Sequence, residues 1–363
     1  MNYILREALD ILSRPTNWFR MPNAIKALSG FYLTKWTGRH YSWGYPFMMM
    51  IEPTNICNLR CPLCITGSKM MTRADGFMSL DHYKHLIDEM SPYLMHVTLW
   101  SQGEPFVNKS FLDMISHTSS KGIRTMTSTN GHFLKENADR IVESGLSTLI
   151  VAMDGATQET YEQYRVNGKF DKVYEGMKAV TAAKKRKNSQ TPVIELQFIV
   201  MKHNEHEIQR IHELASECGA NTVSLKTAQV YTKEQADEFL PTLEKYRRYQ
   251  NANGELQMRM DEINFCRWTL LCPVVNWDGT VSPCCFDKNA DYPLGNVFEE
   301  GGMRSIWKNK TYANFRRRVL EDRKAIPICT NCSEGLEIEI VEKERVGTNH
   351  RQVSEQETMV ATN

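Results

Sequence analysis

The stretch that decides the fold is Ile51-Glu-Pro-Thr-Asn-Ile-Cys57-Asn-Leu-Arg-Cys61-Pro-Leu-Cys64, in which three cysteines lie four and three residues apart. It follows directly on an apolar run, residues 47–52, that predicts a β-strand. Three thiolates on one loop can bind three irons of a cubane cluster and leave the fourth iron open to a small molecule. The alternative is a structural zinc site, which normally takes four ligands and often paired Cys-x-x-Cys motifs. The position at the end of a strand favours the iron–sulfur cluster.

Around this loop, short apolar runs rich in β-forming residues alternate with amphipathic helical patterns. One such pattern is Leu80, Tyr83, Ile87 and Met90, whose spacing puts the four side chains on one helix face. Successive βα units predict an α/β fold, a partial (β/α)6 TIM-like barrel with its function at the carboxyl ends of the strands. The predicted strands are residues 47–52, 96–101, 123–128, 148–153, 193–201 and 222–226.

A second group of cysteines occupies the last third of the chain. Clustered cysteines without an export signal indicate metal or redox sites rather than disulfides. In this region residues 268–277 and 280–284, joined by Asp278-Gly279, predict a β-hairpin, and residues 309–321 predict a basic helix. Cys272 is expected in the core of the first of these strands, and Cys218 on the apolar face of an earlier helix. The group consists of Cys266, Cys272, Cys284, Cys285, Cys329 and Cys332.

The loop of Cys57, Cys61 and Cys64 resembles the signature loop of the radical S-adenosylmethionine (SAM) superfamily, although Leu63 stands where that family often has an aromatic residue. The resemblance implies a [4Fe–4S] cluster on these three cysteines, with the amino and carboxylate groups of SAM on the open iron. Reductive cleavage of SAM would yield a 5′-deoxyadenosyl radical that abstracts a hydrogen atom from the substrate. It also implies a reducing partner such as flavodoxin or ferredoxin.

Further motifs of the same family follow the next three predicted strands. Gly103-Glu104-Pro105 is similar to the glycine-rich motif that contacts the amino group of SAM, with Gln102 in place of the usual first glycine. Thr129-Asn130-Gly131 and Met153-Asp154-Gly155 resemble the next two, although Ala152 stands where many relatives carry a serine. Asn130-Gly131 could instead be a simple turn, and Arg165 a solvated surface charge rather than a partner of the SAM carboxylate. The SAM-binding residues that the resemblance implies are Gly103, Glu104, Pro105, Ser128, Asn130, Asp154 and Arg165.

The segment Asn276-Trp-Asp-Gly-Thr-Val-Ser-Pro-Cys284-Cys285 resembles the SPASM/twitch extension of radical SAM enzymes. The full extension has cysteines after the position of Cys332, and none is present here. The resemblance therefore implies a single auxiliary [4Fe–4S] cluster, as in the butirosin-pathway aminocyclitol dehydrogenase group. A cluster with four protein ligands has no open iron and suits electron exchange, and a structural zinc is the alternative. The implied ligands are Cys266, Cys284, Cys329 and Cys332.

Composition excludes some classes of function. Lys and Arg total 44 against 43 Asp and Glu, so the net charge of +1 gives no electrostatic case for nucleic-acid binding. No apolar run approaches the ~18 residues that span a bilayer. Arg6, Glu7 and Asp10 interrupt the N-terminus, which excludes a signal-peptide core and predicts a cytoplasmic protein.

Residues 1–46 combine basic residues with aromatic ones, such as Trp18, Trp36 and Trp43. They could contact a membrane surface or a lipid-linked substrate, but a helical arm packed on the outside of the barrel is the favoured interpretation. The predicted organisation is an N-terminal extension (1–46), a radical SAM core barrel (47–227), a linker helix (228–254), an auxiliary-cluster domain (255–335) and a disordered tail (336–363).

The resulting hypothesis is a radical SAM oxidoreductase that acts on a small polar, carbohydrate-like substrate, with the auxiliary cluster as electron acceptor. Radical epimerisation and peptide maturation are the alternatives within the family. A non-catalytic iron–sulfur electron carrier is the alternative from another class, and it has no need of the SAM motifs. The sequence identifies neither the substrate nor a catalytic acid, base or hydrogen donor.

Overall fold

The computed structural model describes residues 13–252, 255–258, 264–299, 301–333 and 340–346. All six predicted barrel strands are confirmed as β1 to β6, which lie side by side in chain order and pair in parallel. The strands are β1 (Met48–Ile51), β2 (His96–Thr98), β3 (Arg124–Thr129), β4 (Thr148–Ala152), β5 (Val193–Val200), β6 (Thr222–Thr227), β7 (Tyr249–Ala252), β8 (Glu255–Met258), β9 (Val274–Val275), β10 (Val281–Ser282) and β11 (Ile340–Arg345).

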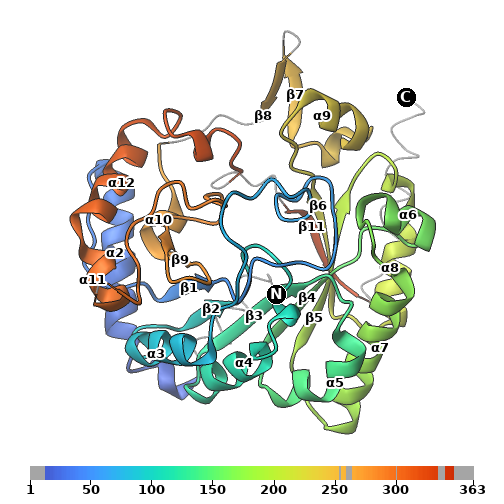
Figure 1. Ribbon diagram of the computed structural model, residues 1–363, viewed down its shortest axis with the longest axis horizontal. Helices are drawn as coiled ribbons and strands as arrows, with labels where there is room; N and C mark the ends of the chain where they lie inside the picture. Colours follow the sequence, from blue (N-terminus) through green and yellow to red (C-terminus); the bar gives the residue numbers. More distant parts are fainter. Residues whose placement is uncertain (1–12, 253–254, 259–263, 300, 334–339, 347–363) are drawn as a thin grey trace, which may run out of the picture.

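Helices cover the outer side of the curved sheet, as α3, α4, α5 and α7 show in Figure 1. Successive residues of a strand point to opposite faces. On β1, Met49 and Ile51 therefore pack in the main core with Tyr83, whereas Met50 faces the inside of the barrel. The helices are α2 (Met21–Thr37), α3 (Leu80–Met90), α4 (Phe111–Ser120), α5 (Leu134–Glu143), α6 (Gln158–Tyr164), α7 (Phe170–Arg186), α8 (Ile208–Glu217), α9 (Lys233–Phe239), α10 (Arg267–Leu271), α11 (Gly302–Lys308) and α12 (Lys310–Asp322).

The predicted hairpin around Asp278-Gly279 exists, but it is shorter than expected and belongs to the barrel sheet. β9 pairs antiparallel with β10 and also parallel with β1, so the C-terminal region extends the open edge of the barrel. Residues 268–271 form part of helix α10 rather than a strand, and Cys272 caps this helix. Pro273 accounts for the end of the helix, because a residue before proline is disfavoured in helical conformation.

The predicted linker helix is wrong in its length. Helix α9 ends at Phe239, two residues before Pro241, which cannot donate the backbone bond that a longer helix would require. A short 3-10 turn at Glu244–Tyr246 and the antiparallel pair β7–β8 follow instead. The prediction of disorder from residue 336 is also wrong in part, because β11 pairs antiparallel with β6 and closes the other edge of the sheet. Residues 336–339 and 347–363 lie outside the described residues.

The N-terminal segment packs along the outside of the molecule, as the favoured interpretation predicted. Arg20 donates to the carbonyls of Ser91 and Lys121, which precede strands β2 and β3. Further on, Phe31 packs edge-to-face on Phe265, with ring centroids 5.0 Å apart. Figure 1 shows α2 beside α11 and α12, so one arm joins the base of the barrel to the C-terminal region. Among the described residues, no helix is both long and apolar enough to cross a membrane.

Candidate active site

The first cysteine group lies on the loop after β1, where the sequence placed it. Cys61 is buried, whereas Cys57 and Cys64 are partly exposed. The pKa of Cys57 is raised to about 12, mainly by burial and in smaller part by the nearby charges of Glu104, Cys61 and Cys64. Three thiolates in this position repel one another and are stable only around a cationic group.

The loop after β2 packs directly on this cysteine loop through Gly103. Its φ of +73° lies in the left-handed region, and a Cβ there would lie 2.6 Å from the Thr54 carbonyl oxygen. Only glycine fits both restrictions. The next residue, Glu104, donates its backbone N–H to the Ile56 carbonyl at 2.9 Å. Gly103 therefore fixes the two loops against each other, and Pro105 then begins a 3-10 turn.

The Glu104 carboxylate is buried at the end of β3. It accepts from the Thr129 hydroxyl at 2.8 Å, from the Asn130 N–H at 2.7 Å and from the Phe106 N–H at 3.2 Å. Burial raises the pKa of this carboxyl to about 7. An ionised carboxylate has about four acceptor positions. These three donors leave one position, which suits an ammonium group.

Asn130 connects the end of β3 to the cysteine loop. Its amide nitrogen donates to Asn58 Oδ1 at 2.8 Å and lies 3.9 Å from the Cys57 sulfur. His132 holds this amide through Nδ1, while its Nε2 accepts from the Lys169 N–H at 2.8 Å. Asn130 is thus more than a simple turn residue, because its side chain contacts a predicted ligand.

Arg165 is largely buried beside the cysteine loop and is not a solvated surface charge. Its Nε donates to Asp154 Oδ2 at 2.5 Å, and its Nη1 lies 3.8 Å from the Cys61 sulfur. Burial lowers the pKa of this guanidinium, but Asp154 and Cys61 outweigh burial and the pKa is raised. Asp154 also accepts from the Ile199 N–H at 2.7 Å, so it holds Arg165 against the end of β5.

Ser128 is the one predicted SAM-binding residue with no distinctive contact. It is partly exposed on β3, between the buried residues Thr127 and Thr129. By the alternation of the strand it points into the barrel. The structure thus gathers Gly103, Glu104, Asn130, Asp154 and Arg165 around the cysteine loop, and places Ser128 on the adjacent inner wall.

The second cysteine group is assembled from three separate segments. Cys266, Cys284, Cys329 and Cys332 are all buried. Burial raises the pKa of Cys284, and the neighbouring charges of Cys285, Cys266 and Cys332 raise it further. Cys266 and Cys332 therefore lie close enough to Cys284 to affect its charge, as does its chain neighbour Cys285.

Arg323, at the end of α12, is the cation of this second group. It donates to the Phe265 carbonyl at 3.0 Å, next to Cys266. Burial lowers the pKa of Arg323, but the charges of Cys332, Cys266 and Cys329 outweigh this effect and the pKa is raised. In the described part of the chain, no three His, Cys, Asp or Glu side chains converge closely enough to share one metal ion.

Cys285 follows Cys284 in the chain, and its charge contributes to the raised pKa of Cys284. It packs with Met48 and Met50 of β1 and with Cys272 and Val274, on the inner side of the barrel sheet. Cys218 is buried between α8 and α7, where its thiol donates to the Tyr174 carbonyl.

A buried ion pair within the barrel region also contacts the C-terminal region. Arg73 binds both carboxylate oxygens of Glu52, at 2.9 and 2.8 Å, and donates to the Lys288 carbonyl at 2.9 Å. Nearby, the ring of Trp277 lies so close to Gly76 that a Cβ there would be 2.4 Å from it. The segment after the first cysteine loop is thereby fixed to the segment after Cys285.

A cavity of about 440 Å³ lies where these segments meet. Leu63 and Ile65 from the first cysteine loop form one side, and Ile328 and Asn331 from the loop of Cys329 and Cys332 form another. Polar groups contribute as well, among them Lys288, whose Nζ contacts the Tyr231 hydroxyl. The predicted site residues do not line this cavity themselves, but its lining includes chain neighbours of Cys61, Cys64, Cys329 and Cys332, so the cavity lies beside both cysteine groups.

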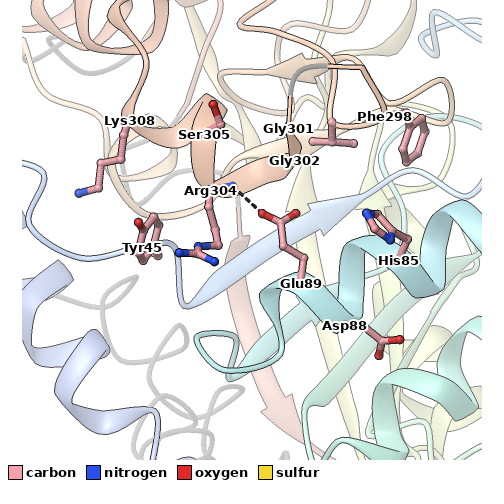
Figure 2. A pocket seen from close by; sticks show the side chains of 11 residues that line it. Tyr45, His85, Asp88, Glu89, Phe298, Gly301, Gly302, Arg304, Ser305 and Lys308 are labelled. Atoms are coloured by element: carbon pink, nitrogen blue, oxygen red, sulfur yellow. Dashed lines mark hydrogen bonds between the residues drawn. The ribbon is translucent and has the colours of Figure 1, made fainter.

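A second and larger hollow, of about 810 Å³, lies on the outer surface between α3 and α11. Figure 2 shows Glu89 pointing at the start of α11, where it accepts from the Met303 and Arg304 N–H groups at 2.9 Å. Arg304 lies over the Tyr45 ring. These groups hold α11 against α3, and none of the predicted site residues lines this hollow.

Comparison with known proteins agrees with this arrangement. Residues 51–215 match the radical SAM superfamily, and residues 266–333 match the SPASM iron–sulfur cluster-binding domain. The chain thus combines a radical SAM region with a C-terminal SPASM domain. With these two regions, it uses SAM with a [4Fe–4S] cluster and carries auxiliary iron–sulfur binding.

Its relatives differ in their substrates. The chain is 23% identical over 308 residues to the mycofactocin maturase MftC of Mycobacterium tuberculosis, covering 79% of this chain and 75% of the relative. The structure is similar to that of BtrN in complex with AdoMet and 2-DOIA, with a TM-score of 0.52, 19% identity and coverage of 83% and 98%. It is also similar to Streptococcus suis SuiB bound to S-adenosylmethionine, with a TM-score of 0.59, 13% identity and coverage of 80% and 71%. These likenesses support the fold and leave the reaction open.

Several residues at the site had no signal in the sequence. Arg73 and Arg323 stand in no motif, and only the folded chain brings them to Glu52 and to the second cysteine group. His132 could have been noticed, because it directly follows Asn130-Gly131 at a predicted strand end.

Proposed function

We propose that this protein oxidises a small polar substrate, such as a carbohydrate, by two electrons. One hydrogen atom leaves a carbon, the hydroxyl group on that carbon loses a proton to solvent, and a single auxiliary cluster accepts the remaining electron. In this proposal Cys57, Cys61 and Cys64 hold the SAM-binding cluster, and Cys266, Cys284, Cys329 and Cys332 hold the auxiliary one. When bound, the first cluster and SAM supply a radical that takes one hydrogen atom from the substrate.

The observation that carries the proposal is the cavity that lies beside both cysteine groups. A substrate held there would lie beside Leu63, next to Cys64, and beside Ile328, next to Cys329. The four buried cysteines satisfy a cubane completely, so the second site would exchange electrons rather than bind the substrate. Lys288 and Asn331 supply polar groups for recognition, while Leu63 and Ile328 exclude water.

The residues around the first cysteine loop have distinct proposed roles. Glu104 would accept from the SAM ammonium at its remaining acceptor position. Asn130 would steady the loop through Asn58, and Arg165, held by Asp154, would offset the negative charge next to Cys61. Ser128 would line the barrel wall where the cofactor lies.

A metabolite experiment tests the reaction. A strain without the gene is expected to accumulate the substrate, and reduced protein with SAM should convert it to a product two mass units lighter. Each turnover should release one 5′-deoxyadenosine. Cys329→Ala should still release 5′-deoxyadenosine and melt cooperatively, but form no such product. A product of unchanged mass would contradict the oxidation.

Epimerisation is a second candidate, and one observation favours it. The Cys285 thiol packs on the inner face of the barrel sheet, where a thiol could return a hydrogen atom to a substrate radical. In that case the product keeps the mass of the substrate, and Cys285→Ser stops turnover while 5′-deoxyadenosine is still formed. Under the oxidation proposal Cys285→Ser stays active.

A further inference from the structure

The outer face of helix α2 carries a stripe of exposed apolar residues. Ile25, Leu28, Tyr32 and Trp36 recur at helical spacing, and Trp36 is 78% exposed. At 100° per residue these four side chains fall within one quarter of the helix circumference. Tyr32 and Trp36 are neighbours, with ring centroids 5.9 Å apart.

Two more aromatic residues lie just before the helix. Trp18 and Phe19 are 73% and 89% exposed. Such values are unusual for large apolar side chains, which normally bury most of their surface. Together with the stripe they define the aromatic face of the arm, formed by Trp18, Phe19, Ile25, Leu28, Tyr32 and Trp36.

The opposite side of α2 is fixed to the protein. Ala24, Gly30 and Thr34 are buried, and a Cβ at Gly30 would lie 3.0 Å from the Tyr41 carbonyl oxygen. Phe31 packs on Phe265 of the C-terminal region. The helix therefore cannot turn its aromatic face inward, and the rigid arm presents this face to the surroundings.

The charges around the aromatic face all have one sign. Lys26 and Lys35 lie on either side of the stripe, and Arg39 follows the end of the helix, all three exposed. Residues 13–46 contain no Asp or Glu. Tryptophan and tyrosine favour the boundary between lipid headgroups and acyl chains, and flanking cations favour anionic headgroups.

We propose that the aromatic face of the arm attaches the protein peripherally to the surface of an anionic membrane. Lysines are depleted in protein–protein interfaces, so their position on both margins of the stripe favours lipid over a second copy of the chain. α2 would lie in the plane of the interface, with Trp36 and Tyr32 among the headgroups. The proposal does not depend on the reaction that the enzyme catalyses.

Vesicle co-sedimentation tests it with the full chain. Wild-type protein should sediment with phosphatidylcholine vesicles that contain about a third phosphatidylglycerol, and much less with phosphatidylcholine alone. Raising the salt concentration should weaken binding, because screening reduces the attraction to anionic lipids. The variant Trp18→Ser/Tyr32→Ser/Trp36→Ser should bind at least about tenfold more weakly.

Matched variants distinguish membrane binding through the aromatic face from nonspecific binding through other exposed apolar or basic side chains. Lys26→Glu/Lys35→Glu should lose the preference for anionic vesicles, whereas Lys172→Glu/Lys178→Glu on α7 should keep it. Leu243→Ser, which removes another exposed apolar side chain, should bind like wild type. Thermal melts should match wild type for all variants, since every substituted side chain is exposed.

Three outcomes would overturn the proposal. Wild-type protein could remain in the supernatant with both vesicle types, or the aromatic triple variant could bind as tightly as wild type. Light scattering could also show a wild-type dimer that the triple variant converts to a monomer, which would assign the face to a second copy of the chain.

Discussion

The two cysteine groups differ in how they are built and in how open they are. Cys57, Cys61 and Cys64 lie on one short loop, and the first and last of them are partly exposed. The second group draws its four cysteines from segments between Cys266 and Cys332, and all four are buried. An open set of three suits a cluster that must bind a small molecule, and a closed set of four suits one that exchanges electrons.

The cations of the two groups also differ. Arg165 approaches Cys61 from the barrel and is held by Asp154, at the edge where SAM is expected. Arg323 lies among Cys332, Cys266 and Cys329 in the interior of the C-terminal region. Each group thus pairs an arginine with its cysteines, but the first pairing lies at an edge that a small molecule can reach and the second lies in the protein interior.

The largest expected effect follows from replacing the three cysteines of the first group. Protein reconstituted with iron and sulfide should bind about eight irons, from two cubane clusters. The triple variant Cys57→Ala/Cys61→Ala/Cys64→Ala should retain about half of the iron and release no 5′-deoxyadenosine, because the open site is gone. Cys218→Ala is the matched control and should keep all of the iron. A wild-type content near four irons would leave only one cluster.

The next effect concerns the buried ion pair of Arg73 and Glu52, from which Arg73 also donates to the Lys288 carbonyl. Arg73→Ala leaves the buried Glu52 carboxylate without its cation, which should lower the free energy of unfolding by about 3–5 kcal/mol. Arg140→Ala removes a half-exposed pair with Asp113 and should cost less than about 1 kcal/mol. Chemical denaturation of both variants gives the comparison. Equal losses would mean that the buried pair stabilises the fold no more than the half-exposed one.

A smaller effect is expected at the SAM site alone. Glu104→Gln places an amide where the carboxylate accepts from the Asn130 N–H, and it removes the charge proposed to bind the SAM ammonium. The affinity for SAM should fall about tenfold to a hundredfold, as for the loss of a charged hydrogen bond. Equilibrium binding of SAM measures this, with the iron content as control. Unchanged affinity would remove Glu104 from the cofactor site.

The smallest effect is expected from Cys285. Because this thiol packs with Met50 and Cys272 and is not one of the four proposed ligands, Cys285→Ser should leave the iron content unchanged. Cys284→Ser should lose the auxiliary iron. If Cys285→Ser loses it as well, the second group has a different set of ligands.

The first cysteine group could be predicted from sequence because its ligands are local. The spacing of Cys57, Cys61 and Cys64 after a strand depends on a few adjacent residues, and so do the six barrel strands. The assembly of the second group could not be predicted from sequence, because its cysteines come together only in the folded chain. No local pattern reveals that β9 joins the sheet at β1, or that Arg323 reaches Cys332.

The errors lie where proline or long-range pairing overrides the local pattern. Pro241 ends α9 in a charged stretch that was predicted to be one helix, and Pro273 ends α10 where a strand was expected. The polar segment Ile340–Arg345 has few apolar residues but pairs with β6. There, Lys343 reaches the largely buried Glu195 at 2.7 Å, a contact that composition cannot predict.

The most direct measurement of the difference between the two groups is electron paramagnetic resonance of the dithionite-reduced protein, with and without SAM. Adding SAM should change the signal of one cluster only. The same change should persist in Cys329→Ala, and it should be absent from Cys57→Ala/Cys61→Ala/Cys64→Ala. A signal that SAM leaves unaltered, or a response that disappears with Cys329, would contradict the assignment of the open site to the first loop and the closed site to the second.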